Sequence, residues 1–84
     1  MDAEPDLQKE LQDLAKADRD IAEGERRLTE QIALIRLMTE RGESTLEAEK
    51  IRRNFEETLE VFRSHRRLIA ETLARIEGHR RRRG

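Results

Sequence analysis

Apolar residues recur every seven positions along most of this chain, without interruption in either half. The row in the first half consists of Leu7, Leu14, Ile21, Leu28 and Ile35. The row in the second half consists of Ala48, Phe55, Phe62, Ile69 and Ile76. This spacing is typical of long helices that pack along one stripe, and it does not match the two-residue alternation of a half-buried strand. We therefore expect an all-α chain.

Stop and start signals lie between the two rows. Gly42 suits the left-handed position that follows a helix, and Ser44 with Glu47 fits a capping box that opens the next helix. Near the N-terminus, Pro5 suits a first helical position because its φ is already close to helical. The periodicity stops at Gly78. These signals set the boundaries of two helices.

The boundaries predict one domain, a helical hairpin over residues 1–78. Its helices cover about residues 5–41 and 45–77, and its turn covers residues 42–44. The remaining residues, 79–84, are expected to be a basic flexible tail.

A connection this short makes the two helices antiparallel neighbours. The numbers of facing residues in such a pair have a constant sum, and a sum of 83 matches every member of one apolar row with a member of the other. Phe55 then faces Leu28, and Phe62 faces Ile21. We expect an antiparallel coiled-coil hairpin.

Each helix of a coiled coil also needs a second interface row. Our prediction for the first helix is Leu11, Asp18, Glu25, Ile32 and Thr39. For the second helix it is Ile51, Thr58, His65 and Thr72.

These second rows predict a polar layer, with Asp18 facing His65 and Glu25 facing Thr58. Buried polar residues of this kind fix register in coiled coils. The alternative is a catalytic or pH-sensing pair, since a carboxylate near a histidine raises the histidine pKa. No nucleophile or phosphate-binding loop accompanies the pair, so we expect no catalytic residues and no enzyme activity.

Eight apolar side chains fall beside the predicted stripe: Leu34, Leu37, Met38, Leu46, Leu59, Val61, Leu68 and Leu73. A chain of 84 residues buries little surface on its own, so these side chains need another surface. A homodimer that forms a four-helix bundle provides one, and a helix of another protein is the alternative occupant. Gly24 either permits close helix approach or is merely tolerated within the helix.

Composition removes several classes of site. The chain has no cysteine, and His65 and His79 belong to no Glu-x-x-His unit, so we expect neither a metal nor another cofactor. No apolar run is long enough to span a bilayer, and the N-terminus is acidic rather than basic. We expect a cytoplasmic protein without a membrane partner.

Charge is distributed unevenly along the chain. Residues 1–25 contain nine acidic and three basic residues, and residues 63–84 contain eight basic and two acidic residues. A hairpin places these oppositely charged ends side by side. The run Arg80, Arg81, Arg82 and Arg83 remains available to bind nucleic acid, although no tyrosine or tryptophan is present to stack on bases.

Three segments carry a resemblance to a known group: residues 17–27 (Ala-Asp-Arg-Asp-Ile-Ala-Glu-Gly-Glu-Arg-Arg), 55–59 (Phe-Glu-Glu-Thr-Leu) and 63–66 (Arg-Ser-His-Arg). The chain resembles short uncharacterised proteins of α-proteobacteria from about Leu11 to Leu73. The resemblance implies a stand-alone bacterial hairpin in which Asp18, Gly24, Glu25 and the 55–58 segment recur. It implies no activity.

The function we expect is a small non-enzymatic protein–protein interaction module. It acts as a homodimeric hairpin, either as an adaptor or as a regulator in bacterial signalling. It binds itself, and a second protein is a further candidate partner. The alternative is a nucleic-acid-associated accessory protein that uses the C-terminal arginines.

Overall fold

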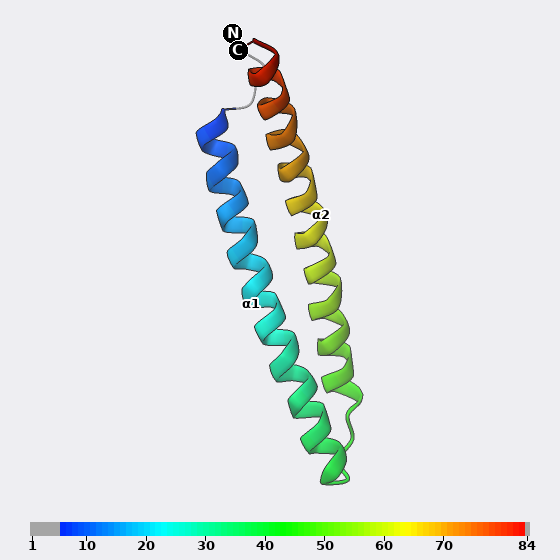
Figure 1. The fold of residues 1–84 in the computed structure, drawn as a ribbon. Coiled ribbons are helices and arrows are strands. Elements are labelled where there is room, and N and C mark those ends of the chain that lie inside the picture. Colours follow the sequence, from blue (N-terminus) through cyan, green and yellow to red (C-terminus); the bar gives the residue numbers. More distant parts are fainter. Residues whose placement is uncertain (1–5, 84) are drawn as a thin grey trace.

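A computed structural model gives the structure of the chain and describes residues 6–83. It contains helix α1, Leu7–Glu40, and helix α2, Leu46–Arg83. The helices lie side by side in an antiparallel hairpin whose principal extents are 64, 19 and 16 Å (Figure 1). The prediction of an all-α helical hairpin is confirmed.

Local capping explains where α1 begins. The backbone of Asp6 is extended, and its Oδ1 atom accepts a hydrogen bond from the backbone N–H of Gln8 at 3.1 Å. A short acidic side chain at this position satisfies a free N–H group and interacts favourably with the positive end of the helix dipole. The predicted start at Pro5 lies outside the described residues.

The left-handed turn at Gly42 forms as the sequence predicts. Gly42 has a φ of 71°, in the left-handed region. Its N–H donates to the carbonyl of Thr39 at 3.0 Å, and the N–H of Glu43 donates to the carbonyl of Met38 at 2.9 Å. This pair of hydrogen bonds is a Schellman motif, which requires a residue that adopts positive φ without strain.

Replacing Gly42 with alanine is expected to lower the free energy of unfolding by about 1 kcal/mol, because a Cβ strains the left-handed backbone. Nothing lies within 4 Å of that Cβ, so a loss reports the backbone alone. Gly78→Ala is the matched control. A Cβ there also meets nothing within 4 Å, and the change is expected to stabilise the helix by up to about 1 kcal/mol. Urea denaturation followed by circular dichroism measures both variants, and effects of the same sign would contradict this account.

Helix α2 is longer than predicted. It continues through Gly78 to Arg83, so the expected end near residue 77 is wrong, and residues 79–83 of the expected tail of residues 79–84 are helical. The last tail residue lies outside the described residues. Arginine is a good helix former, and cations near the C-terminus interact favourably with the helix dipole. Glu77 adds an ion pair with Arg81 one turn later, at 3.2 Å. These contributions outweigh the cost of about 1 kcal/mol for one glycine within a helix.

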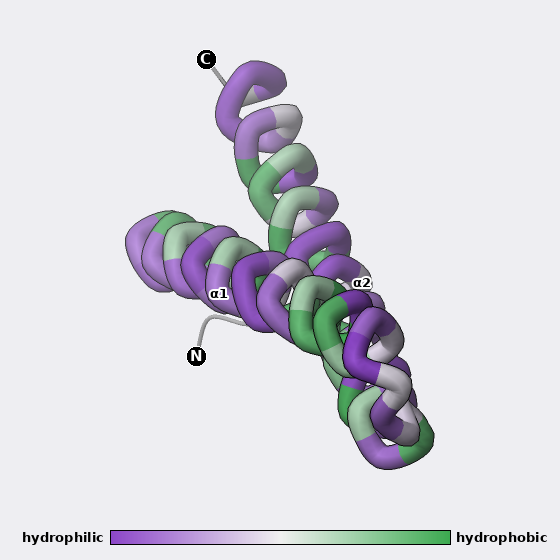
Figure 2. The backbone as a smooth tube through the Cα atoms, turned by 90° about the horizontal axis from the view of Figure 1, so that it is seen from below, coloured by the Kyte–Doolittle hydropathy of each residue, from purple (hydrophilic) through white to green (hydrophobic). Residues whose placement is uncertain are grey.

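The seven-residue apolar rows lie where the helices meet. Ala48 and Ile69 are buried, and the other members of both rows are half-buried. Figure 2 shows apolar and polar segments alternating along two helices that are inclined to each other. The first interface row of each helix is therefore as expected.

The second interface rows differ from the prediction. In α1 the row lies three residues after the first, and consists of Glu10, Ala17, Gly24, Gln31 and Met38. In α2 it lies four residues after the first, and consists of Arg52, Leu59, Arg66 and Leu73. All nine are buried or half-buried, whereas every residue predicted for the second rows is exposed except Thr72, which is half-buried.

The helices pack tightly at Gly24. A Cβ on this residue would lie 2.8 Å from Cδ2 of Leu59, which is only 1% exposed. The two residue numbers also sum to 83, the constant that relates the apolar rows. Gly24 thus permits close helix approach, which is the first of the two roles considered for it.

Candidate functional site

The predicted polar layer does not lie between the helices. Asp18, Glu25, Thr58 and His65 are all exposed. Asp18 accepts a hydrogen bond from Nε of Arg66, not from His65. The reason is that other residues than predicted form the second interface rows. All four side chains therefore lie on the sides of the hairpin and not in its interface.

A buried polar contact is made instead by Gln31, which sequence reasoning missed. Its Nε2 atom donates to the backbone carbonyl of Ala48 at 2.9 Å, across the interface. Gln31 lies seven residues after Gly24, in the same row. The signal that could have identified Gln31 was its place in the row of Ala17 and Gly24, two small residues that allow the helices to pack closely.

One side of the hairpin is covered by ion pairs between and along the helices. Glu25 Oε2 lies 3.2 Å from Arg63 Nη2, and Asp18 pairs with Arg66. Within α2, Arg52 pairs with Glu56 at 2.9 Å. We call this side the ion-paired flank. Its charges are satisfied within one chain.

The other side exposes apolar side chains. On this side, the row of Asp20 and Arg27 in α1 and the row of Thr58 in α2 border the helix interface. These three residues line one common hollow. By the same helical spacing, five exposed apolar residues lie on this side: Leu34, Leu37, Ile51, Val61 and Leu68. We call these five residues the apolar flank.

The apolar flank contains four of the eight residues predicted for a dimer or partner surface, Leu34, Leu37, Val61 and Leu68. The prediction is wrong for Leu59, which is buried in the hairpin, and Met38 and Leu73 are half-buried at the interface. Leu46 is exposed but lies outside the flank. Ile51 was missed because we assigned it to the hairpin interface.

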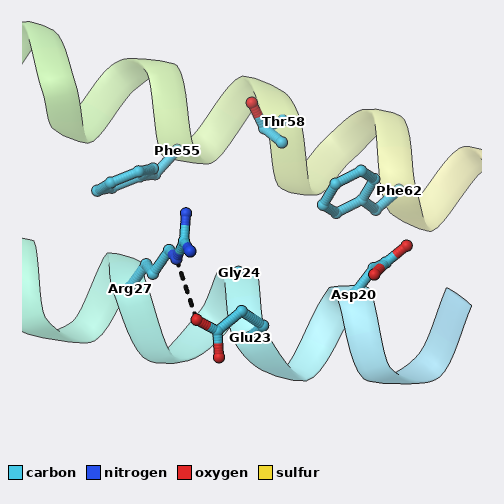
Figure 3. A pocket seen from close by; sticks show the side chains of 7 residues that line it. All are labelled: Asp20, Glu23, Gly24, Arg27, Phe55, Thr58 and Phe62. Carbon is cyan, nitrogen blue, oxygen red and sulfur yellow. Dashed lines mark hydrogen bonds and ion pairs between the residues drawn. The ribbon is translucent and has the colours of Figure 1, made fainter. Parts of the chain in front are cut away.

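A hollow of about 290 Å³ opens on the apolar flank between the rings of Phe55 and Phe62 (Figure 3). Thr58 lies between the two rings on α2, and Gly24 faces them from α1 without a side chain to fill the gap. The hollow therefore depends on the same glycine that lets the helices approach.

Charged residues of α1 form the rim of the hollow. Glu23 accepts hydrogen bonds from Arg26 and from Nε of Arg27, the latter at 3.0 Å. These bonds, led by that of Arg26, lower the pKa of Glu23 from 4.5 to about 2, so its carboxylate stays charged in mild acid. Asp20 pairs with Lys16 at 2.8 Å. The hollow combines aromatic walls with a charged rim, which suits binding an apolar side chain at its centre.

The C-terminal arginines extend α2 as a basic helical segment. Arg80, Arg81 and Arg82 are exposed, whereas the side chain of Arg83 lies outside the described part of the structure. Nucleic-acid binding by this segment stays a prediction. Within residues 6–83, neither helix is apolar enough to span a bilayer, and no three His, Asp or Glu side chains gather as metal ligands.

Comparisons with known proteins provide no family for the chain. No protein-family model, curated protein or solved structure matches it. The resemblance to α-proteobacterial hairpins therefore stays a prediction, and a functional proposal must rest on the geometry of the two flanks.

Proposed function

We propose that this chain is a small non-enzymatic protein-interaction module that works as a homodimer of helical hairpins in the cytoplasm. The apolar flank forms the contact between the two copies. The ion-paired flank stays exposed in the dimer and is available to a further protein, in an adaptor or regulatory role in bacterial signalling.

The observation that supports this proposal is the unequal distribution of exposed apolar side chains. Five of the eight large apolar residues that are at least 41% exposed lie on the apolar flank. An apolar surface of this kind on a small soluble domain marks an interaction site. The opposite flank carries the ion pairs of Asp18, Glu25 and Arg52, and it exposes fewer large apolar side chains, Leu11 and Ile32.

The thin core gives a second reason for self-association. Only four apolar residues in the described part of the chain are buried: Ala17, Ala48, Leu59 and Ile69. Two of them are alanines, which contribute little burial. Chains of this size usually need oligomerisation or a covalent or metal staple, and a second hairpin would cover the exposed leucines.

Replacing Val61 and Leu68 with glutamate is expected to dissociate the dimer. Sedimentation equilibrium of the unmodified protein should give about twice the chain mass of 9.9 kDa. In the double variant the dissociation constant should rise by at least about 100-fold, because two carboxylates would be desolvated in the contact.

The matched control changes apolar residues of similar exposure outside the apolar flank. Leu46 is 67% exposed and Val61 is 65% exposed, so Leu46→Glu tests a generic loss of apolar surface. It should leave the dimer intact. A compact monomer at high micromolar concentration, or equal dissociation by Leu46→Glu, would show that the apolar flank is not a dimer contact.

A further inference from the structure

Helix α2 carries a second stripe beside its hairpin interface. The stripe follows the three-four spacing of a helix-packing seam. It consists of Ile51, Asn54, Thr58, Val61, His65, Leu68, Thr72 and Arg75, and all of these are exposed except Thr72, which is half-buried. The Thr58–Val61 segment of this stripe lies at the level of the hollow, which Thr58 lines. We call these eight residues the α2 stripe.

The two halves of α2 have opposite net charge. Residues 46–60 contain five acidic and three basic residues, and residues 61–83 contain two acidic and eight basic residues. If two α2 helices packed in parallel, the strongly basic halves would lie together. An antiparallel arrangement places each basic half beside an acidic half, which favours that orientation electrostatically.

We infer that a second copy of this chain packs on the α2 stripe in the antiparallel direction, with a two-fold axis at the level of Thr58 and Val61. This inference rests on the proposed homodimer and specifies its geometry. The contact is isologous, so each contact between two different residues occurs twice in the dimer. Val61 of each copy lies over the hollow between Phe55 and Phe62 of the other.

The same axis relates further positions along α2. Ile51 of one copy lies at the level of Leu68 of the second copy, which joins two apolar positions. Glu47 lies within one helical turn of Arg75 of the second copy. In a single chain these two residues are 28 positions apart on one helix, or about 42 Å. Any coupling between them must therefore be intermolecular.

Among the described residues, neither charged side chain has a strong partner. Glu47 is 81% exposed and contacts Lys50 at 3.2 Å, and Arg75 donates from Nη2 to the hydroxyl of Thr72 at 3.2 Å. Exposed pairs one turn apart contribute only a few tenths of a kcal/mol, about 0.3 to 0.5. Both side chains are thus able to exchange these contacts for an ion pair between copies.

Disulfide trapping tests the orientation, and the absence of native cysteine makes it direct. Two single variants of the full chain, Ile51→Cys and Leu68→Cys, are mixed under mild oxidation, with a mass tag on one of them. The antiparallel dimer should give the mixed disulfide, because these positions share a level. Each variant alone should crosslink poorly, since the two copies of residue 51 would lie about 25 Å apart along the helices.

The outcomes separate this inference from the proposed function. A dimer in which each variant crosslinks with itself would be parallel and would overturn the inference alone. A dimer that forms no mixed disulfide would also overturn it. A protein that is monomeric by sedimentation would overturn both.

A charge exchange provides a second measurement without oxidation. Glu47→Arg and Arg75→Glu should each weaken the dimer by about fivefold at low salt, because each places like charges together at two symmetric positions. The double variant Glu47→Arg/Arg75→Glu should recover the original affinity. Strictly additive weakening in the double variant would contradict the antiparallel contact.

Discussion

Replacing Leu59 with alanine is expected to lower the free energy of unfolding by about 2 to 5 kcal/mol. Leu59 is 1% exposed and is the largest fully buried side chain of the described residues. It packs against Gly24 of α1, which has no side chain that could move into the space. The cavity is therefore expected to remain open. Urea denaturation followed by circular dichroism measures the loss.

Leu46→Ala is the control for this substitution, because it removes the same atoms from a side chain that is 67% exposed. It should change the free energy of unfolding by no more than about 0.5 kcal/mol. All proteins must be compared at one concentration, since self-association would make apparent stability depend on it. Similar small losses for both variants would mean that Leu59 is not a core residue.

Replacing Gly24 with alanine should have opposite effects in two backgrounds. In the unmodified protein the new Cβ would lie 2.8 Å from Cδ2 and 3.2 Å from Cγ of Leu59, so the side chain or the helix must shift. Overpacking costs about 1 to 3 kcal/mol, and the gain in helix propensity offsets about 1 kcal/mol of it. A net loss of about 1 kcal/mol is expected.

In the Leu59→Ala background the same substitution should stabilise the protein by about 1 kcal/mol, because the obstructing side chain is absent and only the propensity gain remains. The two backgrounds form a double-mutant cycle with a coupling energy of about 2 kcal/mol. Denaturation of the four proteins at equal concentration measures it. If Gly24→Ala stabilises the protein equally in both backgrounds, Gly24 is a tolerated glycine and not a site of close approach.

The surface available for binding could be predicted only in part. Counting apolar residues beside the stripe correctly selected five exposed residues, Leu34, Leu37, Leu46, Val61 and Leu68. It failed for Leu59, because the choice of second row decides which leucines are inside. The hollow could not be predicted, since it needs the two phenylalanine rings and Gly24 to lie on opposite helices at one level.

The sequence by itself determined the two helices, the left-handed turn at Gly42 and the first apolar row of each helix. These features depend on local signals: a seven-residue spacing, capping residues and one glycine with positive φ. Such signals act within a few residues of the chain, so they can be recognised without knowing what lies opposite.

Only the tertiary structure decided the second rows and the role of each flank. On a helix, the row three residues after the first apolar row and the row four residues after it lie on opposite sides of that first row. In α1 these two candidate rows have similar apolar content. The seven-residue periodicity therefore does not decide which of them faces the other helix. The choice depends on how closely the helices approach. Gly24 leaves space for Leu59, and this fit between two distant positions turns Asp18 and His65 outward and leaves the apolar flank uncovered.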